Sequence, residues 1–164
     1  MTPTTPAGVR DSATEIQPAP RWARATSLAL AAVGLAVSAY LTFEHYSASA
    51  TLSCPNTGVV NCVKVTTSSY SKLAGVPVAL LGLVFFVAMT VLCLPWAWRA
   101  GSAWVSRVRL TGAAAGVAMV LYLVWAELFR IDAICLWCTV VHAATVALFG
   151  VLVLGAALRP LDRA

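Results

Sequence analysis

Charge is scarce in this sequence of 164 residues: charged side chains make up 10% of the chain, whereas a water-soluble domain carries about 25%. So little charge cannot cover the surface of a soluble globular domain. A hydrophobic content of 60% likewise excludes a disordered chain. The net charge of +5 indicates no nucleic acid or other acidic partner, because membrane topology accounts for it.

Sequence signatures of the common redox cofactors are also missing. The chain contains no glycine-rich dinucleotide fingerprint, no C-x-x-C-H motif for haem attachment and no flavin site. Nicotinamide, haem and flavin chemistry are therefore not indicated by any motif.

The sequence does contain four long stretches without a charged residue, each of at least 17 residues. A bilayer-spanning helix needs about 20 apolar residues, within a range of about 17–25. We therefore predict an all-α, polytopic membrane protein built as a bundle of four transmembrane helices. The four stretches are residues 25–43, 73–98, 110–126 and 133–158.

Lysine and arginine are distributed unevenly between the two sides of these predicted spans. Lys64, Lys72 and Arg130 lie on one side, and the other eight basic residues lie on the side of the two termini. The positive-inside rule then places both termini in the cytoplasm. The long loop between the first two spans and the short turn 127–132 face outward, in a multi-pass protein of the cell inner (cytoplasmic) membrane.

Composition divides the chain into one membrane domain and two tails. Residues 1–24, rich in proline, threonine and alanine, are predicted to form a disordered cytoplasmic tail. Residues 25–158 form the four-helix catalytic domain, and residues 159–164 form a second cytoplasmic tail. Ala48-Ser49-Ala50 resembles a cleavage site and Leu52-Ser53-Cys54 a lipidation site, but a polar stretch separates both from the apolar run, which disfavours processing.

The five cysteines are placed unevenly on this topology. Cys54 and Cys62 lie in the outward loop, and Cys135 and Cys138 lie at the outward end of the fourth span. Cys93 lies near the cytoplasmic end of the second span, where we expect a small apolar core residue. Because disulfides persist outside the cytosol and are rare inside it, four outward cysteines indicate thiol chemistry at that face.

The motif Cys135-Leu136-Trp137-Cys138 begins the fourth predicted helix, for which Asp132 is the predicted N-cap. A spacing of three residues places both sulfurs on one face of the helix. The amides and dipole of a helix N-terminus stabilise a thiolate, the form that attacks a disulfide. With Cys54 and Cys62, this motif forms two dithiol pairs in series, which suits an electron relay from a soluble protein into the membrane.

A lipid-soluble quinone is the expected acceptor for a site at the outer edge of a membrane. Such a ligand needs an apolar slot and one or two polar groups for its carbonyls. His142 lies on the helix stripe of Cys135 and Cys138, one turn deeper, and Ser68 lies in the outward loop. Both are candidate hydrogen-bond donors to the quinone.

Plainer interpretations of these residues stay open. The four cysteines could hold zinc, although the long spacing of the first pair fits a zinc site poorly, or they could form purely structural disulfides. His142 could be a packed core histidine, and Ser68 a helix cap. Other expectations are a short half-buried helix over residues 63–70 and solvated span ends at Glu44, Glu127 and Asp132. Trp96, Trp98 and Trp104 are expected to be interface anchors. Tyr122 and Trp125 are expected to pack against lipid or within the bundle, with the lining of the pocket as the alternative.

Taken together, these residues resemble the vitamin K epoxide reductase family in its bacterial form. The residues that carry the resemblance are the Cys54-x7-Cys62 pair, Val65, Ser68, Gly75-Val76-Pro77, Gly82, and Cys135-x-x-Cys138 with His142. The resemblance implies a four-helix bundle around a quinone, menaquinone or ubiquinone, with the C-x-x-C motif beside the quinone ring.

The resemblance also implies a role for each residue. Cys54 and Cys62 would exchange with a periplasmic thioredoxin-like (DsbA-like) protein, and Cys135 and Cys138 would reduce the quinone. We assign Cys138 to the quinone side, because it is nearer His142, and Cys135 to disulfide exchange.

Quinone binding would involve Ser68, Val78 and His142, and we expect no metal ion at the site. Val78 and His142 stand where the vertebrate enzymes carry asparagine and tyrosine, which favours a plain quinone over an epoxide. The alternatives are a vitamin K epoxide or quinone reductase run by external thiols and a non-enzymatic membrane subunit with structural disulfides.

Overall fold

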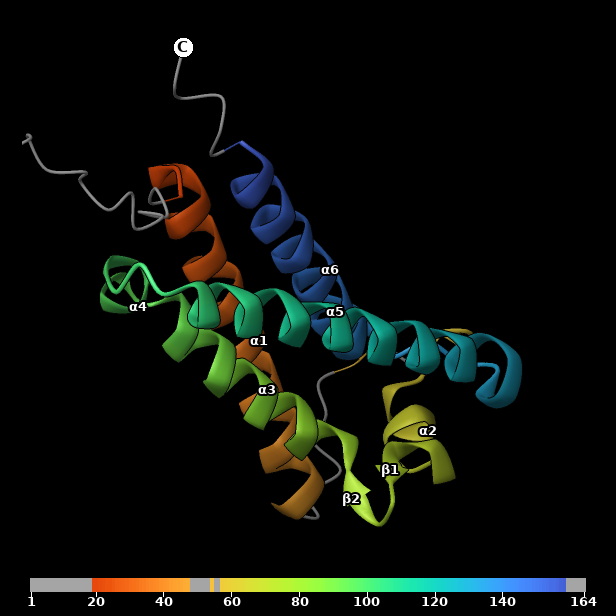
Figure 1. Ribbon diagram of the computed structural model, residues 1–164. Coiled ribbons are helices and arrows are strands. Elements are labelled where there is room, and N and C mark those ends of the chain that lie inside the picture. Colours follow the sequence, from red (N-terminus) through yellow and green to blue (C-terminus); the bar gives the residue numbers. More distant parts are fainter. Residues whose placement is uncertain (1–18, 48–53, 55–56, 159–164) are drawn as a thin grey trace, which may run out of the picture.

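The computed structural model of the protein describes residues 19–47, 54 and 57–158, and within them helices dominate (Figure 1). Four helices are long: α1 (Arg21–Ser47), α3 (Val78–Cys93), α5 (Ala103–Ala126) and α6 (Leu136–Ala157). The shorter elements are α2 (Cys62–Thr66), η1 (Ser69–Ser71), β1 (Lys72–Leu73), β2 (Val76–Pro77), α4 (Pro95–Arg99) and the π-helical turn η2 (Glu127–Ile131). Both candidate processing motifs include residues outside the described part, as does the predicted second tail.

Three helical stretches are long and apolar enough to cross a membrane by length and composition. They are α1, the continuous stretch Ala103–Ile131 formed by α5 and η2, and α6. The first two stretches contain the first and third predicted spans, and α6 covers the fourth except at its two ends. Because α1 begins at Arg21, residues 21–24, assigned by the sequence to the tail, are helical.

The second predicted span gives a helix of 16 residues, about 24 Å long at 1.5 Å per residue. It is shorter than expected because β1 and β2 pair as an antiparallel hairpin before it, with Leu73 opposite Val76. Gly75 takes a positive φ of 84° in the turn of this hairpin, a conformation that glycine adopts without steric cost. At the other end, Pro95 begins the separate helix α4, because a proline in a helix interior removes a hydrogen bond.

Helix α1 packs against both α3 and α6, and small residues on α1 permit the close approach. Gly34 faces the ring of Phe86 so closely that a Cβ atom at position 34 would overlap it. Gly116 of α5 lies beside Phe85 and Thr145 in the same way. These contacts show that small residues of α1 and α5 let the helices pack closely.

Different segments of the chain lie at the two ends of the bundle. Ala23, near the start of α1, lies next to Gly155, near the end of α6. The segment with α2, β1 and β2 lies at the other end, beside the turn between α5 and α6 (Figure 1). The cysteine-bearing loop and the start of α6 are therefore together, away from the start of α1.

The end of α3 is fixed by a buried arginine. Arg109 of α5 donates from Nε and Nη2 to the Leu92 carbonyl oxygen at 3.1 and 2.6 Å, and its guanidinium lies 3.5 Å from the ring centroid of Trp98. Trp98 in turn donates from Nε1 to the Cys93 carbonyl oxygen. Trp98 is buried, so its prediction as an interface anchor is wrong, whereas the predicted core position of Cys93 is confirmed.

Candidate active site

The loop pair of cysteines is joined as a disulfide, Cys54–Cys62, with the two Cα atoms 6.1 Å apart. Cys62 is buried and begins α2. Asn61 caps this helix, because its side-chain oxygen accepts a hydrogen bond from the Lys64 N–H at 2.9 Å. The helix ends at Thr66, so the half-buried helix predicted over residues 63–70 is replaced by α2 and the separate 3-10 turn η1.

Backbone hydrogen bonds attach this loop to the residues before α6. The Asn61 N–H donates to the Ile134 carbonyl oxygen at 3.0 Å, and the Ile134 N–H donates to the Val59 carbonyl oxygen at 2.9 Å. Lys64 adds a bond from Nζ to the Asp132 carbonyl oxygen at 3.3 Å. Since Asn61 and Ile134 each precede a cysteine directly, this pairing brings Cys62 and Cys135 to the same place.

Cys135 is the N-cap of α6, and its sulfur accepts a hydrogen bond from the Cys138 N–H at 3.3 Å. The prediction of Asp132 as N-cap is wrong: with a φ of 51°, Asp132 takes a left-handed conformation and ends η2. The pKa of the Cys135 thiol is lowered, chiefly by the side-chain hydrogen bond with Cys138. Trp137, between the two cysteines, packs edge-on against Tyr40 of α1 with ring centroids 5.2 Å apart.

All four outward cysteines belong to one packed cluster. Cys62 and Cys135 lie in its buried core, and Cys54 and Cys138 pack against that core from partly buried positions. Cys135 and Cys138 are free thiols. The structure therefore brings the two predicted pairs together at one end of the bundle.

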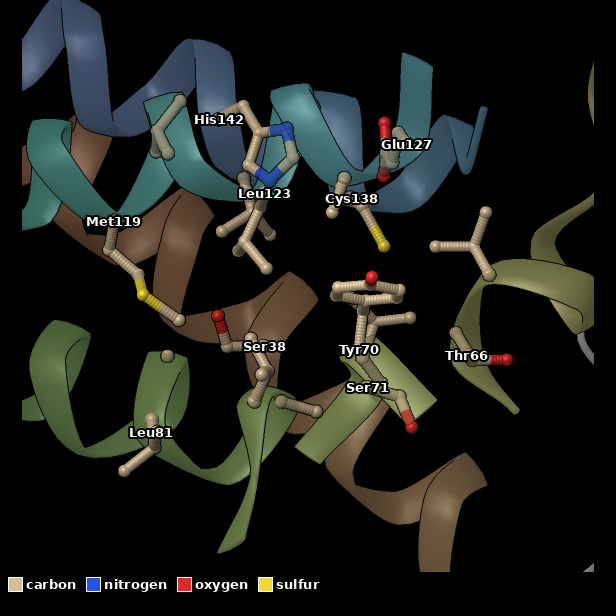
Figure 2. A pocket seen from close by; sticks show the side chains of 18 of the residues that line it. Ser38, Thr66, Tyr70, Ser71, Leu81, Met119, Leu123, Glu127, Cys138 and His142 are labelled. Carbon is tan, nitrogen blue, oxygen red and sulfur yellow. The ribbon is translucent and has the colours of Figure 1, made fainter. Parts of the chain in front are cut away.

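A cavity of about 770 Å³ opens beside this cluster. Helices α1, α3, α5 and α6 supply its mainly apolar walls, and the segment from Val63 to Lys72 supplies polar groups. Cys138 lines the cavity, whereas Cys135 is not among the lining residues. Figure 2 shows the Cys138 sulfur and the His142 ring directed toward this space, with Tyr70 rising from the loop side.

The three residues predicted to bind quinone, Ser68, Val78 and His142, all line this cavity. Ser68 donates its hydroxyl to the Val65 carbonyl oxygen at 2.8 Å, so its proton is already engaged. His142 is buried with 8% of its surface exposed. Within the described part of the chain, no three or more His, Cys, Asp or Glu side chains lie close enough together to bind a metal ion.

Tyr70 and Glu127 are among the cavity residues that sequence reasoning missed. The Tyr70 hydroxyl accepts a hydrogen bond from Arg130 Nε at 2.8 Å, which joins η1 to η2. Glu127 was expected to be a solvated span end, but it is buried with 6% exposure. The only signal in the sequence was its position at the start of the predicted outward turn 127–132, and that position favoured exposure to solvent.

The pair Tyr122 and Trp125 lies outside the cavity lining. Their rings stack on each other with centroids 6.2 Å apart, and both are exposed. Of the other acidic residues predicted to be solvated, Asp132 is exposed, whereas Glu44 is half-buried and lines the cavity.

Comparison with known protein families gives one result that covers the membrane core. Residues 25–153 match the model of the Vitamin K epoxide reductase family. A search of curated proteins found no match. The family match spans well over half of the chain and includes all the residues on which the sequence resemblance rested. With its membrane-length apolar helices, the chain is a multi-pass membrane protein, and it belongs to the vitamin K epoxide reductase family of oxidoreductases.

Proposed function

We propose that this protein is a membrane thiol oxidoreductase that re-oxidises a periplasmic thioredoxin-like, disulfide-forming protein and passes the electrons to a membrane quinone. In this proposal α3 is the fourth membrane span, both termini are cytoplasmic, and the cysteine end of the bundle faces the extracytoplasmic side of the inner membrane. The uneven distribution of basic residues supports this orientation.

The observation that carries the proposal is the position of Cys138 between the cysteine cluster and the cavity. Its thiol packs against the cluster that holds Cys62 and Cys135, and the same residue lines the cavity. A thiol in that position has the loop disulfide on one side and room for an acceptor on the other. This arrangement supports a two-pair relay better than it supports disulfides that only stabilise the fold.

The cavity suits a quinone. Its volume of about 770 Å³ lies within the range of about 300–1,000 Å³ that is typical of small-molecule sites. The apolar side chains of Phe85, Phe86 and Met119 line it, and His142 adds a ring nitrogen. When bound, a quinone supplies an acceptor for two electrons and two protons.

The relay balances in three steps. The partner's dithiol reduces the Cys54–Cys62 disulfide and becomes a disulfide itself. The Cys54–Cys62 dithiol then reduces a Cys135–Cys138 disulfide, with Cys135 as the sulfur that exchanges with the loop pair. Finally the Cys135 and Cys138 thiols give up two electrons and two protons to the quinone as they form a disulfide. The described state, with the loop pair bonded and the second pair free, corresponds to the point before this last step.

A reconstituted assay tests the proposal. Purified protein in detergent receives a reduced thioredoxin-like oxidase and a short-chain quinone, and quinone absorbance reports turnover. We expect Cys135→Ala and Cys138→Ala to abolish quinone reduction, and Cys93→Ala, a buried thiol outside the cluster, to leave it unchanged. Full activity in either of the first two variants contradicts the relay.

Two further measurements separate the alternatives. Replacing the quinone by vitamin K epoxide in the same assay tests the epoxide reductase, which would turn over the epoxide faster than the quinone. In Cys54→Ala or Cys62→Ala protein, the remaining loop thiol should attack the disulfide of the oxidised partner and hold the partner as a mixed disulfide, with the second partner cysteine released as a thiol. Cysteines that neither trap the partner nor react with maleimide after mild reduction would favour a structural role.

A further inference from the structure

We propose that Glu127 is a proton-carrying residue of the cysteine–quinone site, taking up the proton that the Cys135 thiol loses when the second pair becomes a disulfide. This inference rests on the proposed function and concerns a residue that the cysteine motifs do not include. It stands on the burial of Glu127, its interaction with the C-x-x-C motif and its position on the cavity.

Glu127 is an acidic residue held away from solvent. It retains 6% exposure and begins the π-helical turn η2, a geometry that occurs often at functional sites. Its carbonyl oxygen accepts the Ala133 N–H at 3.2 Å, so the turn folds back toward the start of α6. Burying a carboxyl group is costly unless it is compensated, and no ion pair to Glu127 is seen among the described residues.

The carboxyl group interacts with the cysteine motif. The backbone N–H of Cys135 acts on it electrostatically, and the carboxyl group in turn acts on both the Cys135 and the Cys138 thiols. Glu127 also lines the same cavity as Cys138, and Figure 2 shows the two side chains next to each other at its upper edge. The group therefore lies between the thiol pair and the space proposed for the quinone.

The last step of the relay needs such a group. Two S–H bonds break, one S–S bond forms, and two electrons and two protons move to the quinone oxygens. Cys138 lines the cavity, so its proton passes directly to one oxygen of a quinone bound there. Cys135 is fully buried and does not line the cavity, so its proton passes to the Glu127 carboxylate and from there into the cavity, where the second quinone oxygen takes it up.

Several other titratable groups face this region and must be separated from Glu127. Arg130 shares its element η2, but its Nε is bonded to Tyr70. The remaining titratable side chains on the cavity wall are Glu44, His45, Tyr70, Lys72, Cys138 and His142. Cys138 bonds to the Cys135 sulfur but is itself the second reacting thiol. Of the two carboxyl groups on the cavity wall, Glu44 and Glu127, it is Glu127 that acts on the Cys135 thiol.

The substitution Glu127→Gln tests the inference, because the amide keeps the size and polarity of the side chain but can no longer take up a proton. We expect kcat for quinone reduction to fall at least tenfold and to lose most of its dependence on pH, with KM and the thermal midpoint unchanged. Asp132→Asn is the matched control, because this exposed acid lies on the same connection and does not line the cavity. Wild-type kcat across the pH range in Glu127→Gln overturns the inference, as does a loss of kcat matched by a loss of thermal stability.

A second measurement needs no quinone. The infrared difference spectrum between the oxidised and the reduced C-x-x-C pair should contain a carboxyl band that is present in the wild type and in Asp132→Asn but absent in Glu127→Gln. A spectrum without any such Glu127-dependent band contradicts the inference. If the wild type shows the band but reduces no quinone, the proposed function fails, and the proton transfer between Cys135 and Glu127 stands. If the wild type and Glu127→Gln reduce quinone equally well, only the inference about Glu127 fails.

Discussion

The backbone N–H of Cys138 donates a hydrogen bond to the sulfur of Cys135 at 3.3 Å, so the first thiol of the motif is the N-cap of α6. A negative charge at this position is stabilised by the free amides and dipole of the helix. The pKa of the Cys135 thiol is lowered first by the Cys138 side chain and then by backbone N–H groups, while burial and Glu127 act in the opposite direction. Cys135 is therefore the thiol of the pair that forms a thiolate more readily.

This relationship predicts how the titration of Cys135 depends on its neighbour. Because a lowered pKa means more thiolate at a given pH, removing the Cys138 side chain should move the thiolate transition of Cys135 to higher pH. In Cys93→Ala protein with the loop disulfide intact, ultraviolet thiolate absorbance follows the pair alone. We expect the first transition in that background to lie below the single transition of Cys93→Ala/Cys138→Ala. Equal midpoints would mean that Cys138 has no influence on Cys135.

The hydrogen bond from Arg130 to Tyr70 predicts a second effect, on the order of the loop. Tyr70→Phe removes the acceptor hydroxyl and Arg130→Ala removes the donor, so each should raise amide hydrogen exchange in residues 62–71 by about threefold, the scale of one surface hydrogen bond. The double variant should exchange no faster than either single variant, because both remove the same bond. Tyr46→Phe, an exposed tyrosine in α1, is the control that should leave exchange unchanged. Additive effects in the double variant would contradict the pairing.

Much of the fold follows from local properties that a sequence displays. Long uncharged stretches predict α1, α5 and α6, because a membrane helix depends on the apolarity of its own residues. The second stretch is equally apolar, yet Gly75 and Pro95 divide it into a hairpin, a 16-residue helix and a short helix. Its composition indicates the element, and its turn residues set the bounds.

The residues of the site also fall into those that the sequence predicts and those that it does not. The cysteine pairs and His142 were predictable because their spacing places them on one loop and one helix face. Glu127 and Tyr70 were not, because their surroundings depend on contacts between segments far apart in the sequence, such as the bond between Arg130 and Tyr70 and the pairing of Asn61 with Ile134. Asp132 was the natural N-cap by residue type, but the π-helical turn ends at Asp132, and the N-cap of α6 is Cys135.

The packing of Gly34 against Phe86 predicts a strong effect from one added methyl group. Gly34→Ala places a Cβ atom into the ring of a fully buried phenylalanine, and overpacking of a rigid core costs about 1–3 kcal/mol. Gly150→Ala on α6 is the matched control, because no neighbouring atom lies within 4 Å of its added Cβ and alanine is the better helix former. Thermal unfolding in detergent should therefore show a lower midpoint for Gly34→Ala and an unchanged or higher midpoint for Gly150→Ala. A neutral Gly34→Ala would show that α1 and α3 separate at no cost.

His142 and Ser68 both line the cavity, but their hydrogen-bonding states predict different contributions to quinone binding. The Ser68 hydroxyl already donates to the Val65 carbonyl oxygen, so Ser68→Ala should change the KM for quinone by no more than about twofold. His142 has no hydrogen-bond partner among the described residues and faces the cavity (Figure 2), so its ring nitrogen is available to a quinone oxygen. A hydrogen bond worth about 1–1.5 kcal/mol corresponds to about a tenfold change in affinity, and we expect His142→Ala to raise the KM by about that factor.

Exchange between the loop disulfide and the partner dithiol should be unaffected in both variants, since neither side chain belongs to the cysteine cluster. A larger effect from Ser68→Ala than from His142→Ala would reverse this assignment and place the quinone oxygen beside the loop instead of beside α6.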